Sequence, residues 1–355
     1  MKDIILNIVD LNKSFPLHSG ISNLIGFKKT KKIKVIDNIT FKISRGEILV
    51  LAGESGSGKT TIAKLIMRSI NPDSGSIFFD NLDITKLKGK ELLKTRSKIQ
   101  IIFQDPYSSL DPRMKIFDIV KEPLDVHKKD LKKDDIKKYI YSALKKVNLD
   151  PEEISSKYPH MLSGGQRQRV SFARALVLKP LLIIADEPVS MLDVSIRGQI
   201  LELMKKLKQE ENISFLYITH DLATSQYVGD NIIILYKGQI VEQGNIKEVL
   251  YNSLHPYTRA LISAIPKFRN NNNNNNQKQS LHEIKIKNDP ESETVNCGCK
   301  FINKCLYSTE KCKNSEPLLT IAKEEKRTPD HSTSSSFKDP HNSHFVRCFN
   351  YESIY

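Results

Sequence analysis

The sequence predicts an α/β fold built on parallel strands, and three stretches of the 355-residue chain support this. The apolar run 48–52 leads through a glycine-rich turn into a helical stretch at 61–70 with one apolar stripe, which is the order strand, turn, helix. The apolar run 181–185 ends in two acids, as expected of a central strand that delivers carboxylates to the sheet edge where ligands bind. Residues 105–158 look mainly helical, with prolines at the breaks, and interrupt the strand–helix alternation. We therefore expect a parallel sheet with a helical insertion.

The glycine-rich turn after the first of these strands fits the pattern G-x-x-x-x-G-K-[ST] at every position. Its backbone N–H groups would point inward at a phosphate, and the start of the following helix would add partial positive charge. Lys59 would reach the β- and γ-phosphates, and the hydroxyl of Thr60 would coordinate Mg²⁺. A turn without a ligand is the alternative, but the flanking strand and helix favour a nucleoside triphosphate site. Its residues are Gly53, Glu54, Ser55, Gly56, Ser57, Gly58, Lys59, Thr60 and Thr61.

Other strands are expected on both sides of this loop. Alternating or continuously apolar runs lie at 4–11, 35–43, 76–79, 98–103, 213–218, 231–236 and 239–242. The last two runs form a hairpin that turns at Lys237 and Gly238.

Acidic, amide and imidazole side chains follow three of these strands. Asp186 is placed to hold Mg²⁺ through water beside Thr60, and Glu187 to orient or deprotonate the attacking water. Gln104 ends the strand 98–103, and His220 follows the strand 213–218. Solvated acids that merely cap a strand are the alternative for the first pair. A lone histidine is usually structural, although at this edge it can sense the γ-phosphate.

Two further features allow two interpretations each. Phe15 precedes a polar loop at 16–32 and is either a core residue, which its type favours, or a ring on which adenine stacks. Ser163 is a good N-cap for the helical run 167–176, so Leu162-Ser-Gly-Gly-Gln166 either caps that helix or leaves amides uncovered for a ligand.

The composition narrows the class of protein. We find no run of about 18 apolar residues and no secretory signal at the N-terminus, so we expect a cytosolic protein. The formal charge of +14 suits either nucleic acid or an anionic membrane surface. Much of the excess lies in stretches of mixed sign such as 127–138, which indicate a solvated helix face.

The C-terminal part of the chain has its own composition. The seven asparagines at 270–276 predict a disordered linker. All five cysteines lie beyond residue 296, and in a cytosolic protein such a cluster indicates a metal or iron–sulfur site more often than disulfides.

Taken in order, these landmarks resemble the ATP-binding cassette (ABC) family over residues 4–266. The Ser-Gly-Gly-Gln element separates this family from other P-loop proteins. The resemblance implies a P-loop NTPase core of ABC type with an N-terminal antiparallel β-subdomain, a helical subdomain at about 105–160 and a small Cys-containing C-terminal extension. The motifs that carry it are Gly53–Thr60, Gln104, Leu162–Gln166, Leu181–Glu187, Ser190-Met-Leu-Asp193 and His220.

The resemblance also implies that two cassettes share each ATP site. They would pair head to tail, with ATP between the phosphate loop of one and the signature of the other. Asp193 would lie across the seam, Gln104 would connect the γ-phosphate and Mg²⁺ to a membrane subunit, and Phe15 would stack on adenine. The signature residues of this chain are Ser163, Gly164, Gly165 and Gln166.

The subfamily that the chain resembles is the F-type ATPase of bacterial oligopeptide/dipeptide importers. The similar runs are Gln104–Arg113, Ala185–Ser190, Asp193–Arg197 and His255–Leu261. Met191 stands where the family usually has alanine, and we expect little harm from this adaptable side chain. The implied domains are a cassette at 1–266, an asparagine-rich linker at 267–290 and an extension at 291–355.

In that subfamily four cysteines of the extension can hold a [4Fe–4S] cluster, which takes four thiolates. Zinc is the competitor, because four-cysteine sites serve both, and free buried thiols are the third interpretation. The corresponding residues here are Cys299, Cys305, Cys312 and Cys348, with Cys297 as the spare.

The resemblance implies ATP and Mg²⁺ as ligands and a peripheral location on the cytoplasmic side of the plasma (inner) membrane. The implied partners are two transmembrane permease subunits, a second ABC ATPase subunit in a heterodimer and an extracytoplasmic peptide-binding protein, with no nucleic acid. Two alternatives are kept. One is the same machinery importing nickel or another metal complex, and the other is a soluble ABC ATPase associated with nucleic acid or ribosomes.

Overall fold

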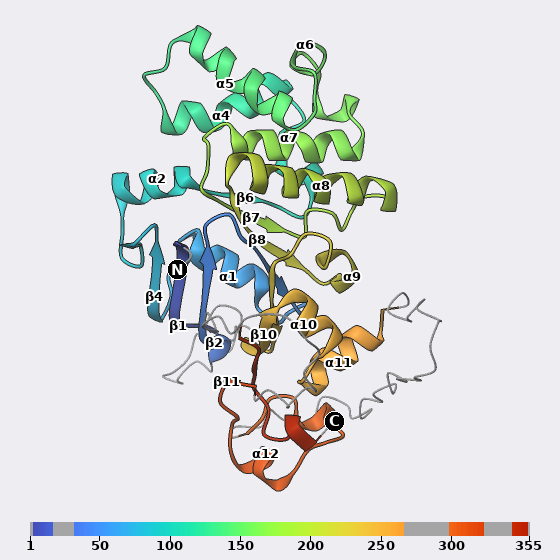
Figure 1. The fold of residues 1–355 in the computed structure, drawn as a ribbon. Helices are drawn as coiled ribbons and strands as arrows, with labels where there is room; N and C mark the ends of the chain where they lie inside the picture. Colours follow the sequence, from blue (N-terminus) through green and yellow to red (C-terminus); the bar gives the residue numbers. More distant parts are fainter. Residues whose placement is uncertain (1–2, 17–31, 266–297, 323–342, 354–355) are drawn as a thin grey trace, which may run out of the picture. The chain divides into compact units, whose positions relative to one another are not determined.

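The structure, a computed structural model, describes residues 3–16, 32–265, 298–322 and 343–353 (Figure 1). It divides into two compact units, which are described separately: the first holds 50–59 and the described residues from 220 onward, and the second holds 3–49 and 60–219. The polar loop predicted between 16 and 32, the asparagine run and Cys297 lie outside the described residues. The domain boundary at 266 stays a prediction.

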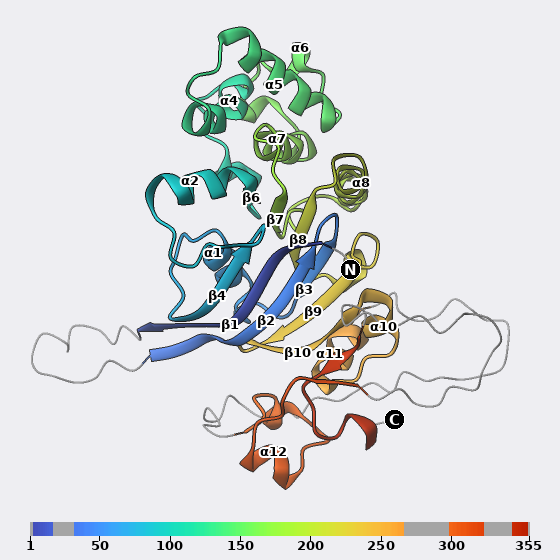
Figure 2. The same cartoon turned by 60° about the vertical axis from the view of Figure 1, so that its left-hand side comes forward.

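An antiparallel sheet opens the second unit, as the resemblance implied. Its strands are β1 (Ile4–Pro16), β2 (Lys32–Ser44), β4 (Ser74–Phe79) and β5 (Leu82–Asp83), in the order β2-β1-β4-β5 (Figure 2). β1 is longer than the run 4–11 because its pairing with β2 continues to Pro16 opposite Lys32. Alternate β2 residues, such as Ile39, Phe41 and Ile43, are buried, which is the period-two pattern that predicted the strand.

The second unit also holds three parallel strands. They are β6 (Ile99–Ile102), β7 (Leu182–Asp186) and β8 (Ser214–Thr219), with β7 paired in parallel to both neighbours. Every residue of β7 and β8 is buried, which explains their continuous apolar runs. All three predicted strands are confirmed to within a residue or two at each end.

The predicted helical insertion is confirmed, and its helices lie together at one end of the unit (Figure 1). The short α3 and the longer α4 and α5 pack on α7, which carries the Ser-Gly-Gly-Gln run at its start. The helices of this unit are α1 (Lys59–Ile66), α2 (Gly89–Lys98), α3 (Pro106–Ser109), α4 (Ile116–His127), α5 (Lys133–Lys146), α6 (Pro151–Ile154), α7 (Gly164–Leu176) and α8 (Val194–Glu211).

Helix α1 ends earlier than the predicted Ile70. Arg68 adopts a left-handed backbone with φ of +54°, and the Ser69 N–H turns back to the carbonyl of Lys64 at 3.0 Å. A left-handed residue closes a helix because it redirects the chain and satisfies the last carbonyls. The predicted apolar stripe of the helix is confirmed, but this turn ends the helix before the predicted position.

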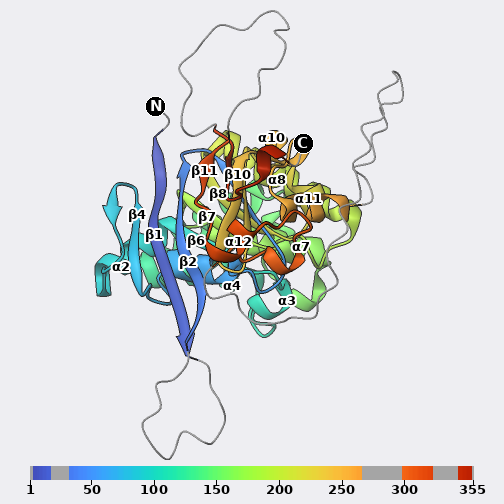
Figure 3. The same cartoon turned by 90° about the horizontal axis from the view of Figure 1, so that it is seen from below.

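In the first unit a sheet extends from β3 (Ile48–Ala52) through the hairpin β9 (Asn231–Tyr236) and β10 (Gln239–Asn245). The hairpin turns at Lys237 and Gly238, as predicted, both with positive φ. Beyond β10 the C-terminal residues add β12 (Phe345–Val346) and then β11 (Thr320–Ile321), seen from below in Figure 3. The helices of this unit are α9 (Leu222–Ser225), α10 (Ile246–Tyr251), α11 (Pro256–Ser263) and α12 (Glu310–Asn314).

A buried carboxylate ties the C-terminal residues to this hairpin. Glu242 of β10 is fully buried and accepts hydrogen bonds from the backbone N–H groups of Leu254 at 2.7 Å and His255 at 2.9 Å. Its Oε1 also lies 2.7 Å from Nε2 of His344, which precedes β12. The extension is thereby anchored on the strand that follows the hairpin turn.

None of the helices within the described ranges has the length and apolar content of a membrane span.

Asp80 provides a test of the antiparallel subdomain. It follows β4 in a left-handed turn and accepts hydrogen bonds from Lys98, at 3.1 Å, and from Arg45. The Lys98 hydrogen bond, helped by Arg45, holds the pKa of Asp80 below its usual value despite partial burial. We expect Asp80→Asn, which tolerates the same backbone, to lower the free energy of unfolding by about 1 kcal/mol at pH 7.

The expected pH dependence follows from the direction of that pKa shift. A carboxyl with a lower pKa in the folded state stabilises the fold above its unfolded pKa, and this contribution is lost as the pH falls through the folded value. Urea unfolding of both proteins should therefore show a difference at pH 7 that shrinks below about pH 4. An equal difference at pH 7 and pH 3 would contradict the role of the ionised carboxylate.

Candidate nucleotide site

The phosphate loop begins directly against β9. A Cβ on Gly53 would lie 2.2 Å from the carbonyl oxygen of Leu235, so no other residue fits without moving the strand. Within the loop the Ser57 N–H donates to the Glu54 carbonyl at 3.2 Å, and the Gly238 N–H donates to the Ser57 carbonyl at 2.9 Å. The hairpin and its turn therefore support the loop from behind.

Lys59 lies inside this loop and is only 6% exposed. Its ammonium donates to the carbonyl oxygens of Gly53 at 2.7 Å and Glu54 at 2.9 Å. A cation held in a curl of backbone at a helix start is suited to bind an anionic phosphate. Of the remaining loop residues, Glu54, Ser55, Gly56 and Thr60 are exposed, Ser57 and Gly58 are buried, and Thr61 is half-buried.

The acidic pair lies in the second unit at the end of β7. Asp186 is 7% exposed, and Glu187 adopts a left-handed backbone with φ of +49°, its N–H donating to the Ile218 carbonyl at 2.9 Å. The Gln104 side chain donates from Nε2 to Oε2 of Glu187 at 2.9 Å. Strained backbone of this kind is concentrated at functional sites. The structure brings Gln104 and Glu187 together, which their separation in the sequence did not show.

Two other candidates are exposed, and their roles stay predictions. His220 follows β8 and belongs to the first unit. Phe15, near the end of β1, is 37% exposed, with the Lys13 ammonium 5.6 Å from its ring centroid. Phe15 is therefore not a core residue, which removes the interpretation that its type favoured and agrees with the stacking interpretation.

The Ser-Gly-Gly-Gln run caps α7, as predicted. The Gln166 N–H donates to the Ser163 hydroxyl at 3.3 Å, and the Ser163 N–H donates to the Gln166 side chain at 3.0 Å, which is a capping box. A Cβ on Gly165 would lie 2.7 Å from the Ile196 side chain, so this glycine lets α7 pack on α8. Ser163 is nevertheless exposed, and so is Asp193 at the start of α8. Capping and presentation to a ligand are both compatible with this geometry.

The donor set of the second unit suits Mg²⁺. Thr60 offers a hydroxyl, Asp186 a carboxylate and Gln104 an amide oxygen, and oxygen ligands are those that this ion prefers. The chemistry of these three residues therefore fits the ion.

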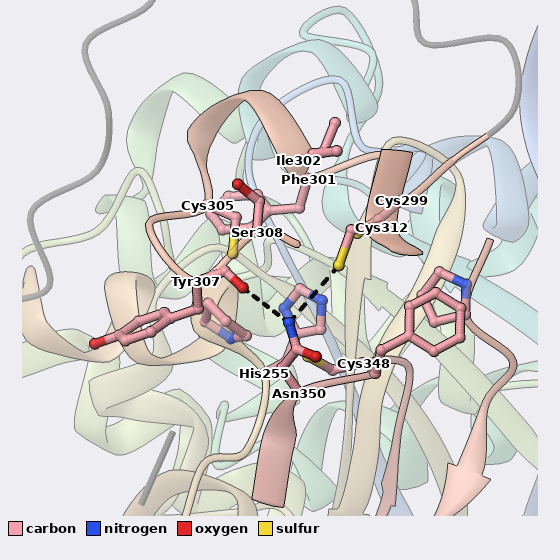
Figure 4. Close-up of a pocket in the computed structure, with 13 residues that line it drawn as sticks. His255, Cys299, Phe301, Ile302, Cys305, Tyr307, Ser308, Cys312, Cys348 and Asn350 are labelled. Carbon is pink, nitrogen blue, oxygen red and sulfur yellow. Dashed lines mark hydrogen bonds between the residues drawn. The ribbon is translucent and has the colours of Figure 1, made fainter. Parts of the chain in front are cut away.

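The four cysteines of the described extension line one cavity of the first unit, together with His255 and Phe301 (Figure 4). Burial raises the pKa of Cys299 to about 11 and that of Cys348 to about 12, and the neighbouring cysteines add to both shifts. The Cys299 N–H donates to the Cys312 carbonyl at 2.9 Å, and Asn350 donates to the Tyr307 carbonyl at 2.9 Å. Cys348, far from the others in sequence, thus reaches the same cavity.

No group of three or more His, Cys, Asp or Glu side chains in the described ranges could hold a metal ion. All four described cysteines are free of disulfides. Four thiols around a shared cavity are the ligand set of either a four-cysteine zinc site or a [4Fe–4S] cluster.

Sequence reasoning missed one residue at the phosphate loop. The hydroxyl of Tyr257, in the first turn of α11, accepts a hydrogen bond from the Glu54 N–H at 3.0 Å. Tyr257 lies in the run His255–Leu261 that carried part of the resemblance, but that run gave no sign of its contact with the loop.

Comparison with known families gives two matches. Residues 36–190 match the ABC transporter family, and residues 241–312 match the C-terminal region of oligopeptide/dipeptide transporters. Among solved structures, the ATP-binding cassette MJ0796, a dimer bound to ADP and Pi, is 28% identical with a TM-score of 0.58, covering 68% of this chain and 99% of that one. CbiO1 of Clostridium perfringens, part of an ABC transporter complex, is 31% identical with a TM-score of 0.60, covering 70% and 92%.

Three curated relatives are similar over most of the chain. The dipeptide transport ATP-binding protein DppF of Haemophilus influenzae is 37% identical, covering 89% of this chain and 92% of its own. The oligopeptide transport ATP-binding protein OppF of Streptococcus mutans is 48% identical, covering 67% and 77%. The oligopeptide transport ATP-binding protein AppF of Bacillus subtilis is 36% identical, covering 99% and 98%. The chain therefore belongs to the ABC transporter family, among the ATP-binding proteins that carry the oligopeptide/dipeptide transporter C-terminal region.

Proposed function

We propose that this chain hydrolyses ATP to power the uptake of oligopeptides or dipeptides through partner permease subunits. The observation that carries the choice of cargo is the match of residues 241–312, because the cassette alone is common to ABC transporters of many cargoes. The similar proteins DppF, OppF and AppF are named for peptide transport. Import of nickel or another metal complex and work on nucleic acid or ribosomes are not favoured by these relatives.

The roles of the site residues follow from their placement. The loop Gly53–Lys59 binds the phosphates of ATP through its backbone N–H groups and the Lys59 ammonium. Mg²⁺, held by Thr60, Asp186 and Gln104, would neutralise the charge that develops on the phosphates. Glu187 orients the attacking water and accepts its proton as the water oxygen bonds to the γ-phosphorus, while the bond from that phosphorus to the bridging oxygen breaks and ADP leaves. Gln104 positions the Glu187 carboxylate through their 2.9 Å hydrogen bond.

A second cassette completes the ATP site in this proposal. Ser163 and Asp193 are exposed at the starts of α7 and α8, so a partner can reach both. Ser163, Gly164, Gly165 and Gln166 contact the nucleotide held by the partner's loop, while His220 senses the γ-phosphate and Phe15 stacks on adenine. We propose that the partner is a different ABC ATPase subunit, which gives a heterodimer.

The remaining partners belong to the membrane. Two permease subunits and an extracytoplasmic peptide-binding protein complete the importer, and this chain binds them from the cytoplasmic side of the plasma (inner) membrane, without nucleic acid. The test is purification of the tagged chain from detergent-solubilised membranes, followed by an ATPase assay in liposomes. We expect two permeases and a second ATPase to copurify and peptide-loaded binding protein to stimulate hydrolysis. Copurification with ribosomes, or stimulation by a nickel complex and not by peptide, would overturn the proposal.

We also propose that Cys299, Cys305, Cys312 and Cys348 hold a [4Fe–4S] cluster. Their common cavity supports this proposal, because four thiolates are the ligand set that such a cluster takes. Anaerobic purification should give a brown protein with iron and sulfide. Cys305→Ser should lose the visible absorption, and Cys297→Ser, the matched control, should keep it. A colourless protein that contains zinc would contradict the cluster.

A further inference from the structure

One peptide group of the phosphate loop is held from both sides. The peptide that joins Gly53 to Glu54 donates its N–H to the Tyr257 hydroxyl at 3.0 Å and offers its carbonyl to the Lys59 ammonium at 2.7 Å. In a trans peptide these two groups point in opposite directions. Tyr257 and Lys59 together therefore fix the rotation of this peptide plane. A shift of Tyr257 would move the carbonyl that holds the lysine.

Tyr257 is itself held in place. It is 1% exposed, and its backbone N–H donates to Nδ1 of His255 at 3.0 Å. Burial lowers the pKa of His255 to about 3, so the ring stays neutral and Nδ1 stays an acceptor. Burial likewise raises the pKa of Tyr257, which keeps its hydroxyl protonated. The ring of Tyr236 packs against it with centroids 4.5 Å apart.

The extension supplies the next contact. Phe301, 3% exposed, meets the ring of Tyr236 edge-on at 5.3 Å between centroids and lies 5.6 Å from Tyr257 and 5.7 Å from His255. Phe301 also lines the cysteine cavity, two positions after Cys299 (Figure 4). Aromatic pairs of this kind contribute stability beyond the burial of their area, so the Phe301 ring restrains Tyr257.

The residue before Phe301 makes a second connection. The Lys300 ammonium donates to the Lys237 carbonyl at 3.0 Å in the β9–β10 turn. The next residue of that turn, Gly238, donates its N–H to the Ser57 carbonyl of the phosphate loop at 2.9 Å. Two consecutive residues of the extension thus connect to the loop at two different points.

We propose that Tyr257 is a positioning residue for the phosphate loop and that the extension segment Cys299–Phe301 sets its position. The segment acts on ATP binding through the Tyr257 hydroxyl at Glu54 and through Gly238 at Ser57. Side-chain contacts then join the cysteine cavity to the phosphate loop. A change in the position of the segment Cys299–Phe301 at the cavity therefore alters the affinity of the loop for ATP. This inference rests on the proposed role of the loop as the ATP site.

The first test removes one hydroxyl. In the full-length chain, Tyr257→Phe should raise the Kd for Mg²⁺–ATP about fivefold, which corresponds to about 1 kcal/mol. It should also speed hydrogen exchange at the Glu54 amide, which a loss of packing elsewhere would not single out. Tyr251→Phe is the matched control, because its hydroxyl contacts the Gln226 side chain at 3.4 Å on the surface of the same unit. Unchanged affinity and unchanged Glu54 exchange in Tyr257→Phe would overturn the proposal.

The second test asks whether Phe301 acts through Tyr257. Phe301→Leu keeps an apolar side chain but loses the ring contacts, and it should weaken ATP binding about threefold. In the Tyr257→Phe background the same change should have little further effect, because residues that act through one contact are not additive. Fully additive effects, or an unaltered Kd in Phe301→Leu, would show that the extension does not set the loop through Tyr257.

A third variant separates this inference from the assignment of the site. If the wild-type chain binds ATP and Lys59→Ala does not, the loop is established as the ATP site. Wild-type affinity in Tyr257→Phe and Phe301→Leu would then overturn the positioning role alone. Retention of ATP binding by Lys59→Ala would instead refute the site, and with it the inference.

Discussion

Glu187→Gln is expected to lower the rate of ATP hydrolysis by about 100-fold to 10,000-fold while ATP binding is retained, because positioned general bases contribute about that much. Glutamine has nearly the same shape and can still pair with the Gln104 side chain, which lies 2.9 Å from the carboxylate. It cannot accept the proton of the attacking water. The left-handed backbone at Glu187 does not depend on the charge, so the turn after β7 should be preserved. The substitution therefore separates binding from chemistry.

The trapped state is the second readout of this variant. With binding intact and hydrolysis slow, ATP should accumulate in a closed pair of cassettes that elutes as a larger species on a sizing column with Mg²⁺–ATP. Glu202→Gln, at an exposed position of α8 where the carboxylate lies 3.7 Å from the Lys205 ammonium, is the control and should hydrolyse ATP normally. Hydrolysis at the wild-type rate in Glu187→Gln would refute the role of this residue.

The sequence was most informative where a function demands several residue types at fixed spacing. The run Gly53–Thr60 predicted a strand, a turn and a helix start, and the structure has β3, the loop and α1 in that order. Ser163 was expected to cap a helix, and the capping box with Gln166 confirms it because both partners are local. Asp186 and Glu187 lie at the end of a strand, as predicted, since a buried parallel strand has a continuous apolar run that ends where the acids begin.

Contacts between distant segments were much less predictable. The hydrogen bond between Gln104 and Glu187 and the one between Glu54 and Tyr257 depend on how the chain returns to the same place. A tyrosine after proline at a helix start has no spacing that points to a phosphate loop. Cys348 likewise reaches the cysteine cavity only because β12 pairs with β10 and brings the C-terminal strand back to the hairpin.

Lys59→Ala should weaken the binding of Mg²⁺–ATP by about a hundredfold or more and abolish nucleotide-dependent transport, because each hydrogen bond from a charged group contributes about 1.5–3 kcal/mol. In the described structure the ammonium is 6% exposed and bonded to the carbonyls of Gly53 and Glu54, so its removal costs the loop an internal support as well as a contact with phosphate. Because the carbonyls of Gly53 and Glu54 lose their hydrogen-bond donor, the variant should also be slightly less stable to heat. The role of Lys59 as a phosphate ligand can be measured separately from its role as a support of the loop. An ATP concentration that saturates the wild type should raise the Tm of the wild type and leave that of the variant unchanged.

The control for this variant lies on the same helix. Lys64, in the last turn of α1, is exposed, so Lys64→Ala removes an equal charge from the same element without touching the loop. Its affinity for ATP should stay within about twofold of the wild type, since exposed charges contribute little at physiological salt. If Lys64→Ala weakened binding as much as Lys59→Ala, the effect would belong to the net charge of the protein. If Lys59→Ala kept wild-type affinity, the buried ammonium would not be a ligand for phosphate, and the assignment of this loop as the ATP site would be refuted. A hundredfold loss confined to Lys59 distinguishes a cation placed by the curl of the loop from one that merely adds to a positive surface.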